Sequence, residues 1–349
     1  MSLQMVFNNF SHLAEAPNSV IKFRELILHL AVQGKLVAQQ SKRDGESLLE
    51  ALWSAGDKKF CDFDAFSFDK CWSIPNSWTF TTLESASFGS GLFADGDWIE
   101  SKDQDPSGPI RLIQLADVGN GKYKNKSSRF LNEETAARLN CTFLETNDVL
   151  VARMPDPIGR ACTFPGDIKR CVTAVDVCIL RPNTEFFLSE FLVIAINSPP
   201  FRQLLQDKIT GTTRSRISRG NLSKLPIPLL GIEEQKIIVA KVNELMLLCD
   251  ALEAQEQAKR ESRVRLNHAM LARLNEAASL EPQNFEQAIA RLGHQFDRLY
   301  ESVETVRKLR STILQLAVQG KLVQQDQSDF VRRQIDHNLD FRLLSRYLR

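Results

Sequence analysis

A basic segment between residues 202 and 224 has side chains suited to binding nucleic acid. It contains six Lys or Arg residues and one acidic residue, Asp207. At its centre, residues 210–221 mix hydroxyl side chains, Gly and Arg, which can donate to phosphates and form forked hydrogen bonds to base edges. The alternative is a solvated loop that Ile217 anchors in the core. We predict DNA contacts here, and the first candidates are Thr212, Thr213, Arg214, Ser215, Arg216 and Arg219.

A second, weaker basic patch follows the Asn120-Gly121 turn. It combines several cations with an aromatic ring: Lys122, Tyr123, Lys124, Lys126 and Arg129. Farther along the chain, Arg153 and Arg160 lie at the ends of an expected hairpin around residues 154–159. The second-rank candidates for DNA contact are Ser90, Arg111, Gln114, Lys122, Lys124 and Arg153.

Two short motifs are compatible with catalysis, but both are weak. Pro155-Asp156 followed by Asp167-Ile168-Lys169 resembles the PD…(D/E)xK pattern of metal-dependent nucleases, in which carboxylates hold the ion and Lys stabilises charge. Asp156 lies between two prolines, and Asp167 follows a Pro-Gly turn instead of lying within a strand. A nuclease that uses Asp156, Asp167 and Lys169 is therefore a minor alternative. Asn197-Ser198-Pro199-Pro200-Phe201 resembles the N-P-P-[FY] loop of adenine methyltransferases, but an inserted Ser interrupts it.

Nucleotide-binding glycine loops are not evident in the sequence. Residues 88–91, Phe-Gly-Ser-Gly, are one residue short of the loop that would hold a methyl donor. The P-loop pattern GxxxxGK[ST] does not occur, so we expect no ATP hydrolysis by this chain. The seven Cys residues form no C-x-x-C pair, and the five His residues lie elsewhere in the chain. This arrangement predicts reduced thiols and no metal site.

Composition indicates a globular protein of about two domains. The net charge is +1, so any nucleic-acid contact must come from a local patch and not from a general basic field. No apolar run approaches the ~18–20 residues of a membrane span. The N-terminus has neither the charged start nor the apolar core of a signal peptide. We therefore expect a cytoplasmic protein.

Hydrophobic periodicity predicts an α+β domain of about 150 residues in the middle of the chain. Helices are expected at 19–33 and 45–55, and another at 188–207 that is interrupted at Pro199-Pro200. The expected strands, which alternate with turn residues, are 79–83, 110–115, 148–153, 161–164 and 174–180.

A long helical region follows this domain. Residues 232–277 lack Gly and Pro, and apolar side chains recur there at steps of three and four. After residues 279–283 the same stepping continues through Phe285, Ile289, Leu292, Phe296, Leu299, Val303, Val306, Leu309, Ile313 and Leu316. The pattern predicts a long antiparallel two-helix coiled coil, with helices of about 70 Å and 50 Å. It would be a spacer that fixes the distance between two functional units, or simply a structural stalk.

One eight-residue sequence, LAVQGKLV, occurs both before and after these regions. The first copy begins at Leu30 and the second at Leu316, an offset of 286 residues. In each copy apolar residues at helical spacing run up to a Gly in the position that ends a helix. Two copies are too few for a solenoid, so we interpret them as equivalent docking elements.

Three features together resemble the specificity subunit of type I restriction–modification systems. They are the duplicated helix end, the 211–221 loop, and the segment from Leu225 to Asp250, in which a proline-bounded strand leads into a Glu-Gln helix start. The resemblance covers nearly the whole chain. It implies an N-terminal helical region at 1–60, a target recognition domain at 61–230, a helical spacer and dimerisation region at 231–323, and a charged tail at 324–349.

The resemblance implies binding and not catalysis. The chain would read one half of a bipartite double-stranded DNA site and dock a methyltransferase subunit. A restriction subunit would complete the complex. S-adenosylmethionine, ATP and Mg would be used by those partners, and no cofactor is expected in this chain. The usual subunit has two recognition domains, whereas one is evident here, so a homodimer is expected to restore the pair. A protein-binding scaffold without a DNA role is the main alternative.

Overall fold

The computed structural model describes residues 18–38, 45–56, 71–211, 214–280 and 282–322. Its contacts divide the chain into two units, Met1–Asp250 and Ala251–Arg349. The long helix α9 (Ile232–Ala277) begins in the first unit and ends in the second. Within the described ranges, no helix combines the length and the apolar content that a membrane span requires.

The first unit is built on three small sheets, which confirms the α+β prediction. The strands are β1 (Thr79–Thr82), β2 (Leu92–Asp95), β3 (Ile110–Ile113), β4 (Arg129–Leu131), β5 (Val149–Ala152), β6 (Ala161–Thr163), β7 (Cys171–Thr173), β8 (Val177–Arg181) and β9 (Pro226–Leu229). Their orders are β1-β9, β2-β8-β5-β6 and β4-β3-β7. All pairs are antiparallel except β3 with β7.

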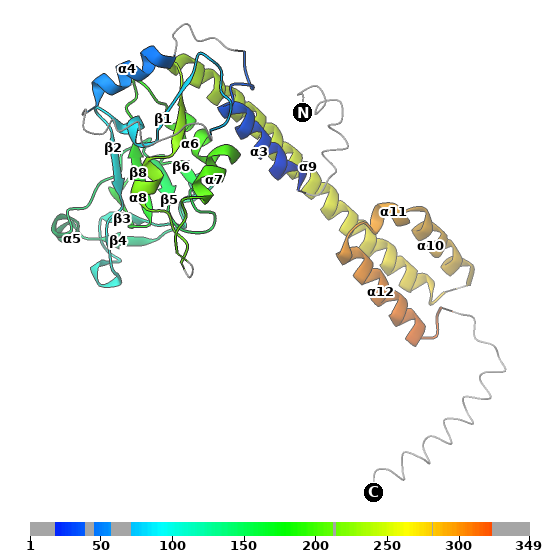
Figure 1. The fold of residues 1–349 in the computed structure, drawn as a ribbon. Coiled ribbons are helices and arrows are strands. Elements are labelled where there is room, and N and C mark those ends of the chain that lie inside the picture. The colour runs from blue at the N-terminus through cyan, green and yellow to red at the C-terminus, as the bar shows by residue number, and fades with distance from the viewer. Residues whose placement is uncertain (1–17, 39–44, 57–70, 212–213, 281, 323–349) are drawn as a thin grey trace. The chain divides into compact units, whose positions relative to one another are not determined.

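The described part of the first unit also contains helices (Figure 1). They are α3 (Ser19–Val32), α4 (Gly45–Ala55), α5 (Glu133–Arg138), α6 (Ser189–Asn197), α7 (Pro199–Gln206) and α8 (Arg219–Ser223), with short 3-10 turns at Glu84–Ser87 and Ser101–Asp103. The predicted break at the proline pair is confirmed, because α6 ends at Asn197 and α7 begins with Pro199. Proline is tolerated there since the first residues of a helix have no intrahelical partner for their N–H groups.

The four-stranded sheet and α6 form the main core. Val149, Val151 and Leu180 are fully buried and cluster with Leu192 and Ile196 of α6. Strand β5 is buried along its whole length, which explains why it has a continuous apolar run and no alternation. These elements give the loops at the ends of the strands a rigid base.

The first copy of the repeat packs onto this core. Ala31 and Val32 of α3 have no exposed surface and lie in a cluster with Phe191 of α6 and Val242 of α9. Helix α3 runs alongside the first part of α9 (Figure 1). Gly34 adopts φ 64°, and Lys35 N–H donates to Leu30 O at 3.0 Å, so the helix ends where the sequence predicts.

Gln235 fastens the start of α9 to the first unit. Its side chain is fully buried, donates to Phe186 O at 2.6 Å and to Leu230 O at 3.0 Å, and accepts from Leu188 N at 2.9 Å. A buried amide with three partners fixes direction as well as position. The Gln in the Glu-Gln helix start therefore fixes the first turn of α9 against the first unit.

The second unit differs from the predicted antiparallel pair. The helix expected from residue 284 onward is three helices, α10 (Pro282–His294), α11 (Phe296–Leu299) and α12 (Val303–Val318). Arg263 pairs with Glu301, and Lys321 Nζ donates to Ser279 Oγ at 2.7 Å. Residue numbers thus increase together along α9 and α12, so these two helices run in the same direction and the two-helix antiparallel prediction is wrong for α12.

An N-cap at Ser302 explains why the helical region is interrupted between α11 and α12. Ser302 is the N-cap of α12, and its hydroxyl accepts from Thr305 N at 3.3 Å, while Tyr300 has left helical geometry at ψ 33°. The apolar stripe predicted along one helix is consequently divided between two faces. Leu292, Leu299, Leu309 and Leu316 are buried, whereas Ile289, Phe296, Val303, Val306 and Ile313 are exposed.

Candidate nucleic-acid interface

The loop between α7 and α8 presents the first-rank candidates. Thr210 and Arg216 exchange backbone hydrogen bonds of 2.9 and 2.8 Å, which close the loop at its base. Gly211 lies at φ +93°, and a Cβ there would meet Arg214 O at 2.5 Å, so the turn requires glycine. Arg214 and Arg216 are exposed and Ser215 is half-buried. Thr212 and Thr213 lie outside the described residues.

Ile217 anchors this loop, as the sequence alternative required, without removing its cations from the surface. Ile217 is fully buried, and its N–H donates to Arg153 O at 3.0 Å. The loop is therefore fastened to the residue that follows β5. Anchoring and DNA contact are compatible roles for the same segment.

A carboxylate brings two predicted contact residues together. Asp95, at the end of β2, accepts from Arg153 Nη1 at 3.0 Å through Oδ1 and from Arg219 Nε at 3.2 Å through Oδ2. Arg153 also donates to Val175 O at 2.5 Å, and Arg219 to Phe93 O at 3.4 Å. The side chain of Arg153 is 15% exposed and that of Arg219 is 42% exposed.

The strand register explains why these residues meet. Asp95 is opposite Cys178, and Val177 is opposite Ala152, so β2 and β5 both end on the same side of the four-stranded sheet. We call this side, formed by strand ends and the loops next to them, the candidate edge. Gly121 N–H donates to Ala161 O at the same edge, on the outer strand β6. β2 and β6 are separated by three strand spacings, about 14 Å. This edge therefore supports the Arg214–Arg219 region and the turn before Lys122.

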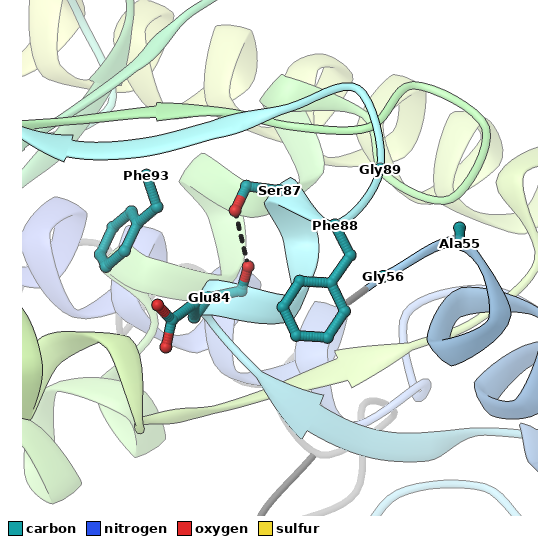
Figure 2. Close-up of a pocket in the computed structure, with 7 residues that line it drawn as sticks. All are labelled: Ala55, Gly56, Glu84, Ser87, Phe88, Gly89 and Phe93. Carbon is teal, nitrogen blue, oxygen red and sulfur yellow. Dashed lines mark hydrogen bonds between the residues drawn. The ribbon is translucent and has the colours of Figure 1, made fainter. Parts of the chain in front are cut away.

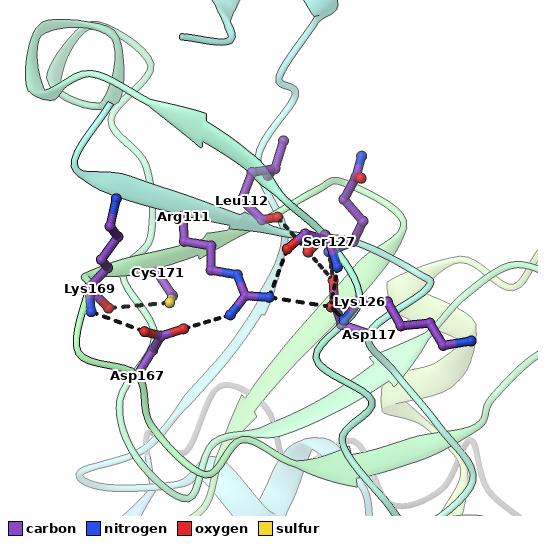
Figure 3. Close-up of polar contacts among 9 residues, drawn as sticks. Arg111, Leu112, Asp117, Lys126, Ser127, Asp167, Lys169 and Cys171 are labelled. Atoms are coloured by element: carbon purple, nitrogen blue, oxygen red, sulfur yellow. Dashed lines mark hydrogen bonds and ion pairs between the residues drawn. The ribbon is translucent and has the colours of Figure 1, made fainter. Parts of the chain in front are cut away.

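Asp117 organises the second basic patch (Figure 3). Its fully buried carboxylate accepts from the backbone N–H groups of Gln114, Lys126 and Ser127 at 2.8, 2.6 and 2.8 Å, and from the Ser127 hydroxyl. One side chain thus joins both ends of the segment that carries the exposed Lys122 and Lys124. Gln114 itself is half-buried at the start of that segment.

Arg111 serves mainly to hold the fold together (Figure 3). Its guanidinium pairs with Asp167 at 2.7 Å, donates to Ser127 O at 2.7 Å and lies 3.9 Å from Asp117, with 12% of the side chain exposed. Burial acts to raise the pKa of Asp167, but the Lys169 N–H and Arg111 outweigh it and the pKa is lowered. The second-rank candidate Arg111 is therefore engaged inside the protein.

Lys122 points toward the helical side of the domain. Its Nζ pairs with Asp250 at 3.1 Å, and Arg24 of α3 pairs with the same carboxylate at 2.7 Å. Hydrogen bonds from Arg24 and Lys122 lower the pKa of Asp250. The pair is largely exposed, so solvent screens it strongly and Lys122 can exchange Asp250 for another anion at little cost.

Ser90 lies away from the other candidates. It precedes Leu92, which is opposite Arg181 at the far edge of the sheet from Asp95. Next to it is a pocket lined by Ala55, Gly56, Glu84, Ser87, Phe88, Gly89 and Phe93 (Figure 2). The Ser87 hydroxyl uses its hydrogen to donate to Glu84 O at 2.8 Å. This lining is not the cationic surface that a DNA backbone needs.

Two internally bonded arginines, the buried Arg160 and the half-buried Arg202, lie behind the candidate edge. Arg160 donates to four backbone carbonyls, those of Leu115, Val118, Met154 and Pro157, at 2.7–3.1 Å. Arg202 donates to Ile158 O at 2.6 Å and to Asn197 Oδ1 at 2.8 Å. Burial, together with the nearby Arg160, lowers the pKa of Arg202 to about 10. Both arginines fasten loops of the edge together.

The geometry does not support the nuclease alternative. Asp156 precedes β6 and Asp167 follows it, so the strand, about 10 Å long, separates the two carboxylates. Asp167 is already paired with Arg111. Among the described residues, no group of three His, Cys, Asp or Glu side chains could hold a metal ion.

Sequence reasoning missed Asp95 and Asp117. Neither lies in a basic stretch, and each acts through partners that folding brings close, such as Arg219, which is 124 positions from Asp95. The only local signal was the spacing of Asp117 from Gln114, because an Asp side chain can accept a hydrogen bond from the backbone N–H three residues before it.

Comparison with known proteins places this domain. Residues 91–261 match the family model described as type I restriction modification DNA specificity domain. Over 323 aligned residues, the chain is 28% identical to the type I restriction enzyme EcoAI specificity subunit of Escherichia coli and 27% identical to the EcoEI specificity subunit of the same organism. The alignments cover 88% of this chain, but 53% and 52% of those relatives. The chain thus spans about half the length of the curated relatives it matches.

Solved structures give weaker similarity. One is the HsdS subunit of Thermoanaerobacter tengcongensis, with 16% identity, a TM-score of 0.40, and 72% of this chain and 52% of that chain covered. Another comes from a study of complex assembly and conformational transition of the type I R-M system, with 15% identity, a TM-score of 0.44, and 76% and 57% covered. Residues 91–261 thus belong to the type I restriction modification DNA specificity domain family, and over 88% of its length this chain is similar to curated type I specificity subunits.

Proposed function

We propose that this chain is a DNA sequence-recognition component of a type I restriction–modification complex and has no catalytic role of its own. The loop at 210–219 carries the proposal. Its exposed arginines project from a closed base, and that base is fastened to the sheet through Ile217. Cations on a preorganised loop can supply both phosphate contacts and base-edge readout.

The test is the salt dependence of duplex binding. Affinity for labelled double-stranded DNA should fall steeply with salt concentration, and replacing Arg214 and Arg216 by Ala should reduce the logarithmic slope by about 1 for each phosphate that is no longer neutralised. Arg265→Ala is the matched control, because Arg265 is an exposed arginine outside the matched segment 91–261. An affinity without salt sensitivity would favour the protein-binding scaffold.

We further propose that two copies of the chain associate through the second unit, so that each reads one half of a bipartite site. The support is the exposed apolar face of α12, where Val303 is 74% exposed and Val318 is 90% exposed. In the first repeat the residue equivalent to Val318 is fully buried, which indicates that this sequence suits a covered position. A two-fold axis would let the same face of each copy cover the other.

The proposal assigns methylation and cleavage to partner subunits that dock on this chain. S-adenosylmethionine, ATP and Mg would be bound by those partners, and the complex would work in the cytoplasm. Co-purification with a co-expressed methyltransferase subunit tests the docking. Sedimentation at micromolar concentration tests the association of two copies, since a monomeric mass contradicts it without affecting the DNA proposal.

A further inference from the structure

We propose that Asp95 and Arg153 are positioning residues that fix Arg219 to read one G·C base pair. This inference rests on the proposed DNA-binding function. It assigns a role in specificity to Asp95, a carboxylate that a search for basic patches would not select. It also gives each of the three residues a separate role in one hydrogen-bonded group. Arg219 is the reading residue, and the other two hold it.

The contacts form a chain that ends at the surface. Val175 O and Asp95 Oδ1 fix the two terminal nitrogens of Arg153, and Asp95 Oδ2 then accepts from Arg219 Nε. Exposure increases along this chain, from 15% for Arg153 to 37% for Asp95 and 42% for Arg219. The buried end is therefore the support and Arg219 is the accessible end.

Arg219 has donors left for a ligand. Its Nε is committed to Asp95 and its Nη1 to Phe93 O, at 3.2 and 3.4 Å. Within the described chain, its Nη2 has no acceptor. The backbone beneath it is also fixed, because Ser218 caps α8 by accepting from Asn221 N at 3.1 Å. Such an arginine is ordered before a ligand arrives, and little rotamer freedom is lost on binding.

The carboxylate favours a base edge over a phosphate. The Asp95 carboxylate beside the Arg219 donors repels phosphate oxygens. The edge of a G·C pair, by contrast, carries both acceptors and a donor, so it is complementary to the Arg219 donors and the Asp95 acceptor together. Guanine offers O6 and N7 as acceptors for Arg, and the cytosine N4 amino group donates to Asp or Glu. Asp95 Oδ1 accepts from Cys178 Sγ at 3.5 Å as well as from Arg153, whereas Oδ2 has capacity beyond Arg219 for a further donor. Arg219 with Asp95 can therefore contact both bases of one G·C pair.

The experiment compares sequence preference and not overall affinity. The full wild-type chain selects from a library of randomised duplex DNA, and sequencing of the bound fraction defines the preferred site. Asp95→Asn should lose the preference for G·C at one position and bind the preferred duplex about ten-fold more weakly. Its affinity for random duplex at low salt should stay equal or rise, because a negative charge is removed.

Asp103→Asn is the matched control, since Asp103 also pairs with an arginine, Arg138, at 2.6 Å in the same unit. It should leave the selected site unchanged. Arg219→Lys keeps the charge at an accessible residue and should lose the same G·C preference as Asp95→Asn. This second variant removes the concern that loss of Asp95 disturbs folding.

Two results would overturn the inference. Asp95→Asn could tighten binding to every duplex alike, which would mean that Asp95 only lowers the local charge. Alternatively, both variants could retain the wild-type site, which would mean that Arg219 reads no base. If the wild-type chain enriches no sequence and binds without salt sensitivity, the proposed DNA function itself fails, and that outcome is distinct from the other two.

Discussion

The two copies of LAVQGKLV place a valine in opposite environments, and a Val→Asp substitution in each provides a matched test. Val32 has no exposed surface and lies against Phe191 and Val242, whereas Val318 is 90% exposed. The local sequence and the helix-ending glycine are the same in both copies, with φ of 64° at Gly34 and 66° at Gly320. Helix propensity therefore cancels in the comparison, and only the surroundings differ.

The expected magnitudes differ strongly. Removing a buried Val loses about 1.5–3 kcal/mol of burial. Placing a polar group there without a partner costs about 1–3 kcal/mol more. Val32→Asp should therefore lower the free energy of unfolding of the first unit by about 2.5–6 kcal/mol. Val318→Asp should change the stability of the isolated chain by no more than about 0.5 kcal/mol, as surface substitutions generally do.

Urea unfolding followed by tryptophan fluorescence is a suitable assay. Trp72 Nε1 donates to Val32 O at 2.9 Å, so this indole reports on the packing of α3. Similar losses at both positions, or no loss at Val32, would refute the reasoning about burial. The same variants test association of two copies. Val318→Asp should lower the mean sedimenting mass, whereas Gln315→Asp, an exposed position on the same helix, should not.

Three further outcomes follow from local chemistry. Asp117→Ala should lower the free energy of unfolding by about 2–4 kcal/mol, because three backbone N–H groups lose a buried acceptor, and thermal unfolding should show a smaller loss for Asp117→Asn. Burial and the nearby Lys35 lower the pKa of His29 below 6.5, so the folded protein resists its protonation. Stability should therefore fall as pH decreases from about 6.5 through the folded pKa, and His29→Gln should flatten that part of the profile. Ser302→Ala should destabilise α12 by about 1 kcal/mol in urea unfolding, whereas Ser302→Asn should retain the cap to Thr305.

Local patterns predicted α3, α4, the α6–α7 pair, α9 and the central strands, but not α5 or α8. The long α9 was evident because its periodicity persists without Gly or Pro, and β5 because its residues are continuously apolar. The strands β2, β4 and β7 were not predicted. Each has only three or four residues, and β4 begins with Arg129 inside a basic stretch, so pairing with neighbours and not local propensity determines them.

In the second helical region, hydrophobic periodicity was present but predicted the wrong structure, one continuous helix instead of several. The apolar steps of three and four continue through Leu299 and Val303, so the pattern alone indicates one helix. Ser302 was an equally strong local signal that a new helix begins there, because Ser is a common N-cap and the acidic Glu304 follows in the first turn. An apolar stripe cannot distinguish a continuous helix from two helices that share its phase, and the capping residue decides between them.

Composition located the basic segments but could not distinguish the roles of their cations. Arg202 belongs to the densest basic stretch, yet its guanidinium is directed at carbonyl and amide oxygens inside the domain. Arg111 is likewise held by Asp167. A cation with several internal acceptors can bind DNA only if those hydrogen bonds break, and each buried acceptor left unpaired costs about 1–3 kcal/mol.

This requirement separates the candidates by accessibility and not by charge. Arg214 and Arg216 are exposed, and Arg219 keeps Nη2 without an acceptor within the described chain. These three can engage DNA without losing internal hydrogen bonds, apart from adjustments within the loop. Arg153 cannot, because its terminal nitrogens hold Asp95 and Val175 O. The contact surface therefore narrows to the 214–219 segment, and the half-buried arginines behind it, which are bonded inside the domain, support that segment.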